Sequence, residues 1–112
     1  MHFESLDKSA EKATELLRTM AHAGRLRIVC ALMEGELSAS ALAHRAHLPA
    51  PALSQQAAIL EANGLIGRRR VGRSMLYRLS APEARALAKL LYRMFCKSPA
   101  APLRRRYARE SR

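Results

Sequence analysis

Two cysteines are the residues of this chain best suited to covalent chemistry. Cys30 and Cys96 are the two cysteines of the 112-residue sequence. A thiolate attacks sulfur electrophiles, and two thiols that meet can be joined by a disulfide. Because the two residues are far apart in the sequence, they can react together only if the fold brings their segments into contact. The alternative is a pair of buried cysteines acting as small hydrophobic residues, which composition alone favours.

A second group of side chains has the chemistry to read DNA bases. Leu53, Ala57 and Leu60 recur at i, i+4 and i+7, which places them on one apolar face of a helix. The opposite face is polar, and glutamine amides can bond adenine N6 and N7 or other base edges. The residues predicted to face DNA from this helix are Ser54, Gln55 and, at the border of the apolar face, Gln56.

A basic hairpin is expected directly after this helix. Segments 66–71 and 74–79 flank Gly72, which supplies the positive φ that a type II′ turn needs. In the second segment, Met75, Tyr77 and Leu79 recur at every other position, which is the strand period. Arginines on such a wing are suited to bind phosphates, which position a protein on DNA without specifying sequence. The hairpin residues predicted to contact DNA are Arg68, Arg69, Arg70, Arg73 and Ser74.

The elements that must position these groups follow from periodicity and from capping residues. Helices are expected over residues 4–20, 22–34, 38–46, about 53–63 and 82–97. Ser38 can cap the third helix, and Ser80 with Glu83 matches a capping box before the last one. Two short helices joined by the Pro49-Ala50-Pro51 turn must cross, as in a helix-turn-helix. The predicted fold is mainly α: a winged helix-turn-helix with five helices and a two-stranded β-hairpin.

Charge and composition limit the classes of partner that the protein is expected to bind. The net charge is +11 and the pI is about 11.0, which favours a polyanionic partner. We expect one domain over residues 1–97, followed by a disordered tail over 98–112 with a basic cluster at Arg104, Arg105 and Arg106. We expect a cytoplasmic protein without a membrane partner, because no apolar run approaches the roughly 20 residues of a spanning helix and no signal peptide is evident.

Enzymatic and cofactor motifs are absent from the sequence. There is no nucleophile–base set, no Gly-rich phosphate loop, and neither HExxH nor CxxC. We therefore expect a protein that is not an enzyme and that needs no cofactor.

The order of helices, the LSQQ segment and the wing RRRVGRSMLYRL resemble the ArsR family of winged-helix repressors over roughly residues 10–97. Within that family, the segments IVCALMEGE and LYRMFC resemble the thiol-based, persulfide-sensing branch of the SqrR/BigR type. The resemblance implies a homodimer that packs through its first and last helices. It also implies release of an operator when Cys30 and Cys96 are oxidised or bridged by sulfur.

Metal-sensing branches of the same family have a different pattern. They carry a Cys-x-Cys pair where this chain has Ser38 and Ser40, and serine hydroxyls are poor ligands for soft metals. Other branches bind zinc through acidic and His residues of the last helix, and residues 84–95 contain none of these. We therefore predict no metal site. The chain also departs from the family in its proline-containing turn and in Gln56, where the family often has His.

The sequence thus favours a homodimeric DNA-binding repressor that binds a pseudo-palindromic operator and responds to small reactive sulfur species or another oxidant. Two alternatives stay open. One is a metal- or metalloid-responsive repressor of the same family, and the other is an architectural protein that binds nucleic acid by charge alone. Sequence preference distinguishes these, since only regulators need a large affinity ratio for one site.

Overall fold

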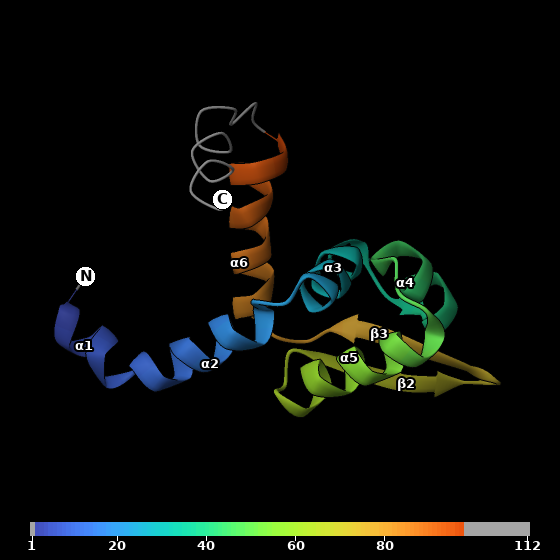
Figure 1. The fold of residues 1–112 in the computed structure, drawn as a ribbon. Helices are drawn as coiled ribbons and strands as arrows, with labels where there is room; N and C mark the ends of the chain where they lie inside the picture. The colour runs from blue at the N-terminus through green and yellow to red at the C-terminus, as the bar shows by residue number, and fades with distance from the viewer. Residues whose placement is uncertain (1, 98–112) are drawn as a thin grey trace.

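The computed structural model describes residues 2–97, and the predicted tail and its arginine cluster lie outside these residues. The chain forms a winged helix-turn-helix, as predicted (Figure 1). Its helical elements are α1 (Phe3–Lys8), α2 (Ala10–Met20), α3 (Ala23–Ala31), the 3-10 turn η1 (Leu32–Glu34), α4 (Ala39–Ala46), α5 (Ala50–Ala62), α6 (Pro82–Tyr92) and the π-helical turn η2 (Arg93–Lys97). Its strands are β1 (Leu37–Ser38), β2 (Ile66–Val71) and β3 (Ser74–Leu79).

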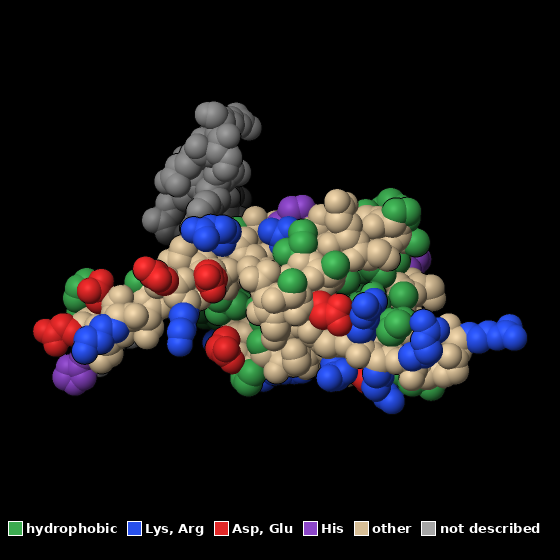
Figure 2. Space-filling view, turned by 90° about the horizontal axis from the view of Figure 1, so that it is seen from below, with side chains coloured by type: hydrophobic (Ala, Val, Ile, Leu, Met, Phe, Trp, Pro, Cys, Tyr) green, Lys and Arg blue, Asp and Glu red, His purple; other side chains and the backbone are tan. Residues whose placement is uncertain are grey.

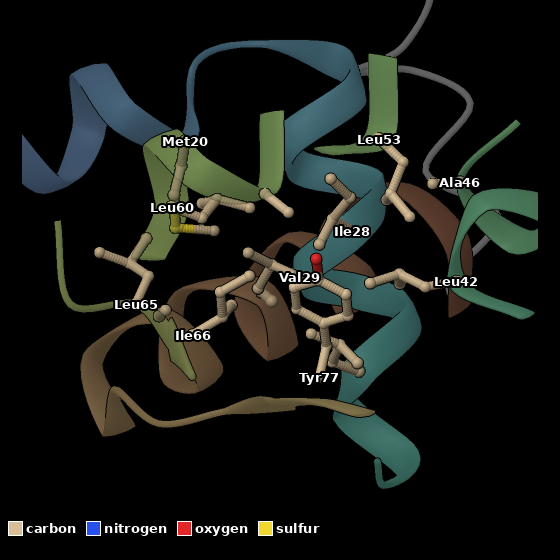
Figure 3. Packing of buried hydrophobic residues seen from close by; sticks show 14 residues of the cluster. Met20, Ile28, Val29, Leu42, Ala46, Leu53, Leu60, Leu65, Ile66 and Tyr77 are labelled. Carbon is tan, nitrogen blue, oxygen red and sulfur yellow. The ribbon is translucent and has the colours of Figure 1, made fainter. Parts of the chain in front are cut away.

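One apolar core joins α3, α4, α5 and the hairpin (Figure 3). The fully buried side chains of this core are Ile28, Val29, Leu32, Leu42, Leu53 and Leu60. Tyr77 lies over the same cluster from β3, and Ala84 and Ala88 close it from α6. Small residues on α6 let that helix approach α3 closely. The predicted apolar face of α5 is therefore confirmed as its inner face.

The helix-turn-helix consists of α4 and α5. The Ser38 hydroxyl accepts a hydrogen bond from the Ala41 N–H at 3.2 Å, which confirms the predicted cap. α4 ends at His47, whose φ of +56° is left-handed. The next helix begins at Ala50, earlier than predicted, because Pro51 is compatible with the first turn of a helix, whose N–H groups have no intrahelical partner.

The hairpin matches its prediction at both strands. Gly72 has φ +61° between them, and Arg68 stands opposite Tyr77 in the antiparallel register. The sequence did not indicate β1, which adds a third strand through the pairing of Leu37 with Tyr77. A two-residue strand has too few positions to show a period. Its pairing attaches the start of α4 to the wing.

Two predictions about helix ends were wrong. The helix expected over residues 4–20 is divided at Ser9, which has non-helical dihedral angles of −103° and 7°. The capping box at Ser80 does not form, since the cap position of α6 is Ala81 without a side-chain bond. Instead the Ser80 hydroxyl donates to the Gly64 carbonyl at 3.2 Å, and the Ser80 and Ala81 N–H groups donate to the Leu65 carbonyl at 3.0 and 3.2 Å. These bonds join the start of α6 to the segment that follows α5.

Two arms extend from the body in Figure 1: the α1–α2 segment and the C-terminal half of α6. Both carry large apolar side chains that the protomer leaves exposed: Phe3, Leu6, Leu17, Leu90, Tyr92 and Met94. Within residues 2–97, no helix is long and apolar enough to cross a membrane.

Candidate nucleic-acid interface and thiol site

The polar face of α5 is only partly open to solvent. Ser54 and Gln55 are exposed, as predicted. Gln56 is half-buried, and its Oε1 accepts a hydrogen bond from Arg25 Nη1 at 2.9 Å. Of the three residues predicted to read bases, Ser54 and Gln55 are exposed to solvent, whereas Gln56 is hydrogen-bonded to Arg25.

Arg25 is a residue of this interface that the sequence did not reveal. Its Nε donates to the Thr19 carbonyl at 2.6 Å, and its backbone N–H donates to His22 Nδ1 at 3.3 Å. The guanidinium thus links the end of α2 to α5. Thr19 is itself buried, and its hydroxyl donates to the Glu15 carbonyl at 2.8 Å.

The wing arginines divide between the two faces of the hairpin. Arg68 and Arg70 stand opposite Tyr77 and Met75, whereas Arg69 stands opposite Leu76 on the other face. All three are exposed, as are Arg73 and Ser74 at the turn. The hairpin therefore presents cations in two directions, with Arg73 at its tip.

Two of these arginines are paired with carboxylates. Arg68 Nε lies 3.2 Å from Glu61 Oε2, and Arg69 makes two bonds to Glu36. The hydrogen bond from Arg69 lowers the pKa of Glu36, so this carboxylate stays charged at neutral pH. Among residues 2–97, Arg70 and Arg73 form no ion pair. These two have their full charge available for phosphates.

Charge is unevenly distributed over the surface. Figure 2 shows Lys and Arg side chains gathered around the wing end, with acidic side chains more frequent toward α1 and α2. The acidic residues of that arm are Glu4, Asp7, Glu11 and Glu15. A polyanion would therefore be attracted to the end of the molecule that carries the hairpin.

The two cysteines are free thiols, and both are exposed in the protomer. Cys30 lies on α3, beside the buried stripe, and Cys96 lies in η2. The alternative of buried cysteines is therefore wrong for the protomer. Although Cys30 is exposed, nearby protein atoms remove enough water to raise its pKa, and the charge of Cys96 raises it further.

A cleft of about 550 Å³ lies beside Cys30, between α3–η1 and α6. Its walls are Cys30, Met33, Glu34, Lys89, Tyr92 and Arg93. The cleft is large enough for a small sulfur compound. In the part of the chain that the structure describes, no group of three or more His, Cys, Asp or Glu side chains could hold a metal ion.

Comparison with known proteins relates this architecture to one family. Residues 22–67 match the model of the bacterial regulatory protein arsR family. The chain is 38% identical to the transcriptional activator HlyU of Vibrio cholerae over 88% of this chain and 91% of that protein. It is also 38% identical to the biofilm growth-associated repressor of Xylella fastidiosa over 83% of this chain and 82% of that protein.

Two solved structures are similar to this chain over most of its length. The transcriptional repressor BigR of Xylella fastidiosa superposes with a TM-score of 0.83 at 37% identity, covering 88% of this chain and all of that one. Reduced HlyU of Vibrio cholerae superposes with a TM-score of 0.78 at 38% identity, covering 84% of this chain and 99% of that one. These matches cover most of the chain, and the chain belongs to the ArsR family of winged helix-turn-helix transcription regulators.

Proposed function

We propose that this protein is a homodimeric repressor, not an enzyme, that releases its operator when Cys30 and Cys96 react with a sulfane sulfur compound or another oxidant. The observation that carries the proposal is the cleft beside the exposed Cys30, because its walls include Arg93 of η2, the turn that also carries the exposed Cys96. Since its target is chromosomal DNA, we place its action in the cytoplasm.

In this proposal, α5 enters the major groove and the wing lies along the backbone. Ser54 and Gln55 face base edges because they are exposed on the outer side of α5. Arg70 and Arg73 bind phosphates or the minor groove, because neither is held by a carboxylate within the described residues. Ser74, exposed beside Arg73, can donate to a phosphate.

The apolar arms support the dimer. Leu17 is 56% exposed, Leu90 43% and Tyr92 54%, which is costly for a chain that stays monomeric. A two-fold axis through α2 and α6 would bury these side chains and leave both wings free. It would set the two α5 helices about 34 Å apart, one turn of DNA, and so require a pseudo-palindromic operator.

With an organic persulfide, RSSH, as the oxidant, the reaction takes two steps. One cysteine thiolate attacks the outer sulfur of RSSH, and RS⁻ leaves, so that this cysteine becomes a persulfide. The second thiolate attacks the inner sulfur of that persulfide and expels HS⁻. The net reaction converts two thiols and RSSH into a disulfide, RSH and H₂S. The bond would fix the separation of α3 from η2 and thereby change the setting of the two α5 helices.

The test compares the wild type with Cys30→Ser and Cys96→Ser. DNA sites are first selected from a random duplex library with the reduced wild type. Binding to the selected site is then measured with and without a persulfide donor, and intact mass is recorded for each sample. The wild type should lose two hydrogens and release DNA, while both variants stay bound. Release by either single variant would contradict a two-cysteine mechanism.

A further inference from the structure

We infer that Lys89 and Arg93 select the sulfur donor that reacts with Cys30, by favouring organic persulfides whose carrier is negatively charged, such as the persulfides of carboxylate-bearing thiols. The inference rests on the proposed function and names the class of compound that acts at that site. It concerns two residues that neither react nor contact DNA in the proposed function. Their role is to bind the part of the donor that leaves, not the sulfur that is transferred.

Both cations line the cleft beside Cys30. The Arg93 N–H donates to the Lys89 carbonyl at the end of α6, so the two side chains are one helical turn apart and lie on the same side of the helix. Across the cleft of about 550 Å³, the wall formed by α3 contains Cys30. This volume is within the range of small-molecule sites, roughly 300–1,000 Å³. A donor whose outer sulfur meets Cys30 therefore places its carrier toward α6.

The charges of the cleft are not balanced by ion pairs. Within residues 2–97, neither Lys89 nor Arg93 forms an ion pair, and both are exposed. Glu34 is the acidic side chain among the described residues of the wall, and it forms no ion pair either. Two cations and one carboxylate leave one positive charge in excess. That excess favours an anionic carrier over a neutral one.

The two cations act on the carrier and not on the thiol. A positive charge close to a thiol lowers its pKa. The pKa of Cys30 is instead raised, mainly by partial desolvation and also by the charge of Cys96, and no cation is among the causes. Lys89 and Arg93 therefore lie too far from the sulfur to activate it. Their charge is available to the far end of a bound donor.

The first chemical step gives the carrier its importance. The Cys30 thiolate attacks the outer sulfur of RSSH, and the S–S bond of the donor breaks. RS⁻ leaves with the electron pair, the proton stays on the transferred sulfur, and Cys30 becomes a persulfide. A carboxylate on R that is bound by Lys89 and Arg93 before the attack holds the outer sulfur next to Cys30. Holding the two reactants together raises the rate at low donor concentration.

The experiment compares glutathione persulfide with the persulfide of glutathione dimethyl ester, which has the same reacting sulfurs but lacks the carboxylate charges. The protein is the full chain with Cys96→Ser, so that the Cys30 persulfide accumulates. Intact mass gives the initial rate of sulfur addition. The charged donor should react faster than the ester by about tenfold at low salt. High salt should reduce the difference, because it screens the charges.

Substitutions in the cleft should change this preference in both directions. Lys89→Gln and Arg93→Gln should each lower it by about threefold and together remove it, while the rate with the ester stays the same. Glu34→Gln should raise it. The matched control is Arg45→Gln with Arg78→Gln, which removes the same charge from exposed residues of α4 and β3 that do not line the cleft. This control should leave the preference unchanged.

Alkylation by iodoacetamide, which is uncharged, tests whether the substitutions alter the thiol itself. The pH profile of Cys30 alkylation should be the same with and without Lys89→Gln and Arg93→Gln. A shifted profile would mean that the two cations act on the thiol, and it would overturn the inference.

The inference is also overturned if the charged donor has no advantage, if the advantage survives the loss of both Lys89 and Arg93, or if the control lowers it as much. The last result would mean that the overall charge of the protein attracts the donor. Failure of the proposed function gives a different result. In that case the wild type stays bound to DNA with either donor, although the rates in the Cys96→Ser background still show the preference.

Discussion

Glu36 and Arg69 form a two-point ion pair that joins the loop before β1 to β2. Arg69 Nε lies 2.9 Å from Glu36 Oε2, and Arg69 Nη2 lies 2.8 Å from Glu36 Oε1. The pair is exposed, so it contributes little to stability. The main effect of the pair is electrostatic. Arg69, which the sequence analysis predicts to contact DNA, has its charge balanced by Glu36 within the protomer.

Glu36→Gln should strengthen binding to random-sequence DNA, because it leaves Arg69 with an unbalanced charge. The plot of log Kd against log salt should steepen by about one counterion. Glu11→Gln changes the net charge equally but lies on α2, and it should leave the slope unchanged. Equal effects of the two variants would mean that net charge, not the pair, controls binding.

Arg73→Ala and Gln55→Ala should distinguish a residue that binds phosphates from a residue that contacts bases. Arg73, exposed at the hairpin tip, should contribute equally to all sequences, so its removal weakens all of them and flattens the salt slope by about one. Gln55→Ala should instead relax preference at one position by roughly 1–3 kcal/mol. Fluorescence anisotropy with selected and random duplexes measures both. An equal loss on both duplexes for Gln55→Ala would contradict its assignment.

The hairpin and the helix-turn-helix could be predicted because their signals are local. Alternation of Met75, Tyr77 and Leu79, with Gly72 before them, fixed both strand boundaries. The apolar spacing of α5 likewise identified its buried face. Such patterns depend on residues within a few positions of one another, where backbone geometry alone sets which side chains share a face.

The remaining features depend on partners far away in the sequence. Gln56 is held by Arg25, and Arg69 by Glu36, across loops that carry no local signal. The Ser80 hydroxyl fits a capping box in sequence, but the Gly64 carbonyl competes for it in the fold. Ser9 interrupts a helix whose apolar stripe runs on without a break, so periodicity could not show the division.

Leu17→Glu and Leu90→Glu should each convert the dimer into a folded monomer. Both side chains are exposed in the protomer, so a carboxylate there would be hydrated in the monomer but buried and unpaired in the proposed dimer. Light scattering should give half the mass, with unchanged circular dichroism and greatly weakened operator binding. Val71→Lys replaces an exposed apolar residue on the wing and should remain dimeric. If all three variants remain dimeric, the dimer interface lies elsewhere on the protein.

Cys30 should react slowly at neutral pH and faster as the pH rises beyond the usual thiol range. Partial desolvation by nearby protein atoms and the charge of Cys96 raise its pKa, so the thiolate forms at a higher pH than in a free thiol. In Cys96→Ser the charge of Cys96 is absent, but the partial desolvation of Cys30, which is the larger cause, persists. Alkylation of Cys30 in that variant should titrate at higher pH than that of glutathione. A midpoint at or below that of glutathione would contradict this.

The raised pKa of Cys30 also affects the stability of the fold. Because the folded state keeps the Cys30 proton longer than the unfolded chain, the free energy of unfolding should fall as the pH rises through the ordinary thiol pKa. In Cys30→Ser this alkaline loss should be smaller, as chemical denaturation at several pH values would show.

Ser38→Ala should lower the free energy of unfolding by about 1 kcal/mol, because the Ala41 N–H loses its cap acceptor. Ser40→Ala is the matched control. Its hydroxyl is exposed and lies 3.4 Å from that of Ser38, and it caps no helix. Urea denaturation of both variants compares them directly. Equal losses would show that the cap contributes nothing of its own.

The bonds from Ser80 and Ala81 to the segment after α5 give α6 the geometry of a lever. The pivot is at residues 80–82, next to the end of the reading helix, and Cys96 lies about 20 Å along the axis from it. If Cys96 moves sideways by about 2 Å to meet Cys30, the axis turns by about 6°. Because α6 is joined to Gly64 and Leu65, that turn would act on the segment that follows the C-terminal end of α5. Because Ala84 and Ala88 of α6 are fully buried between the pivot and Cys96, such a turn would also shift the contacts of α6 with the core.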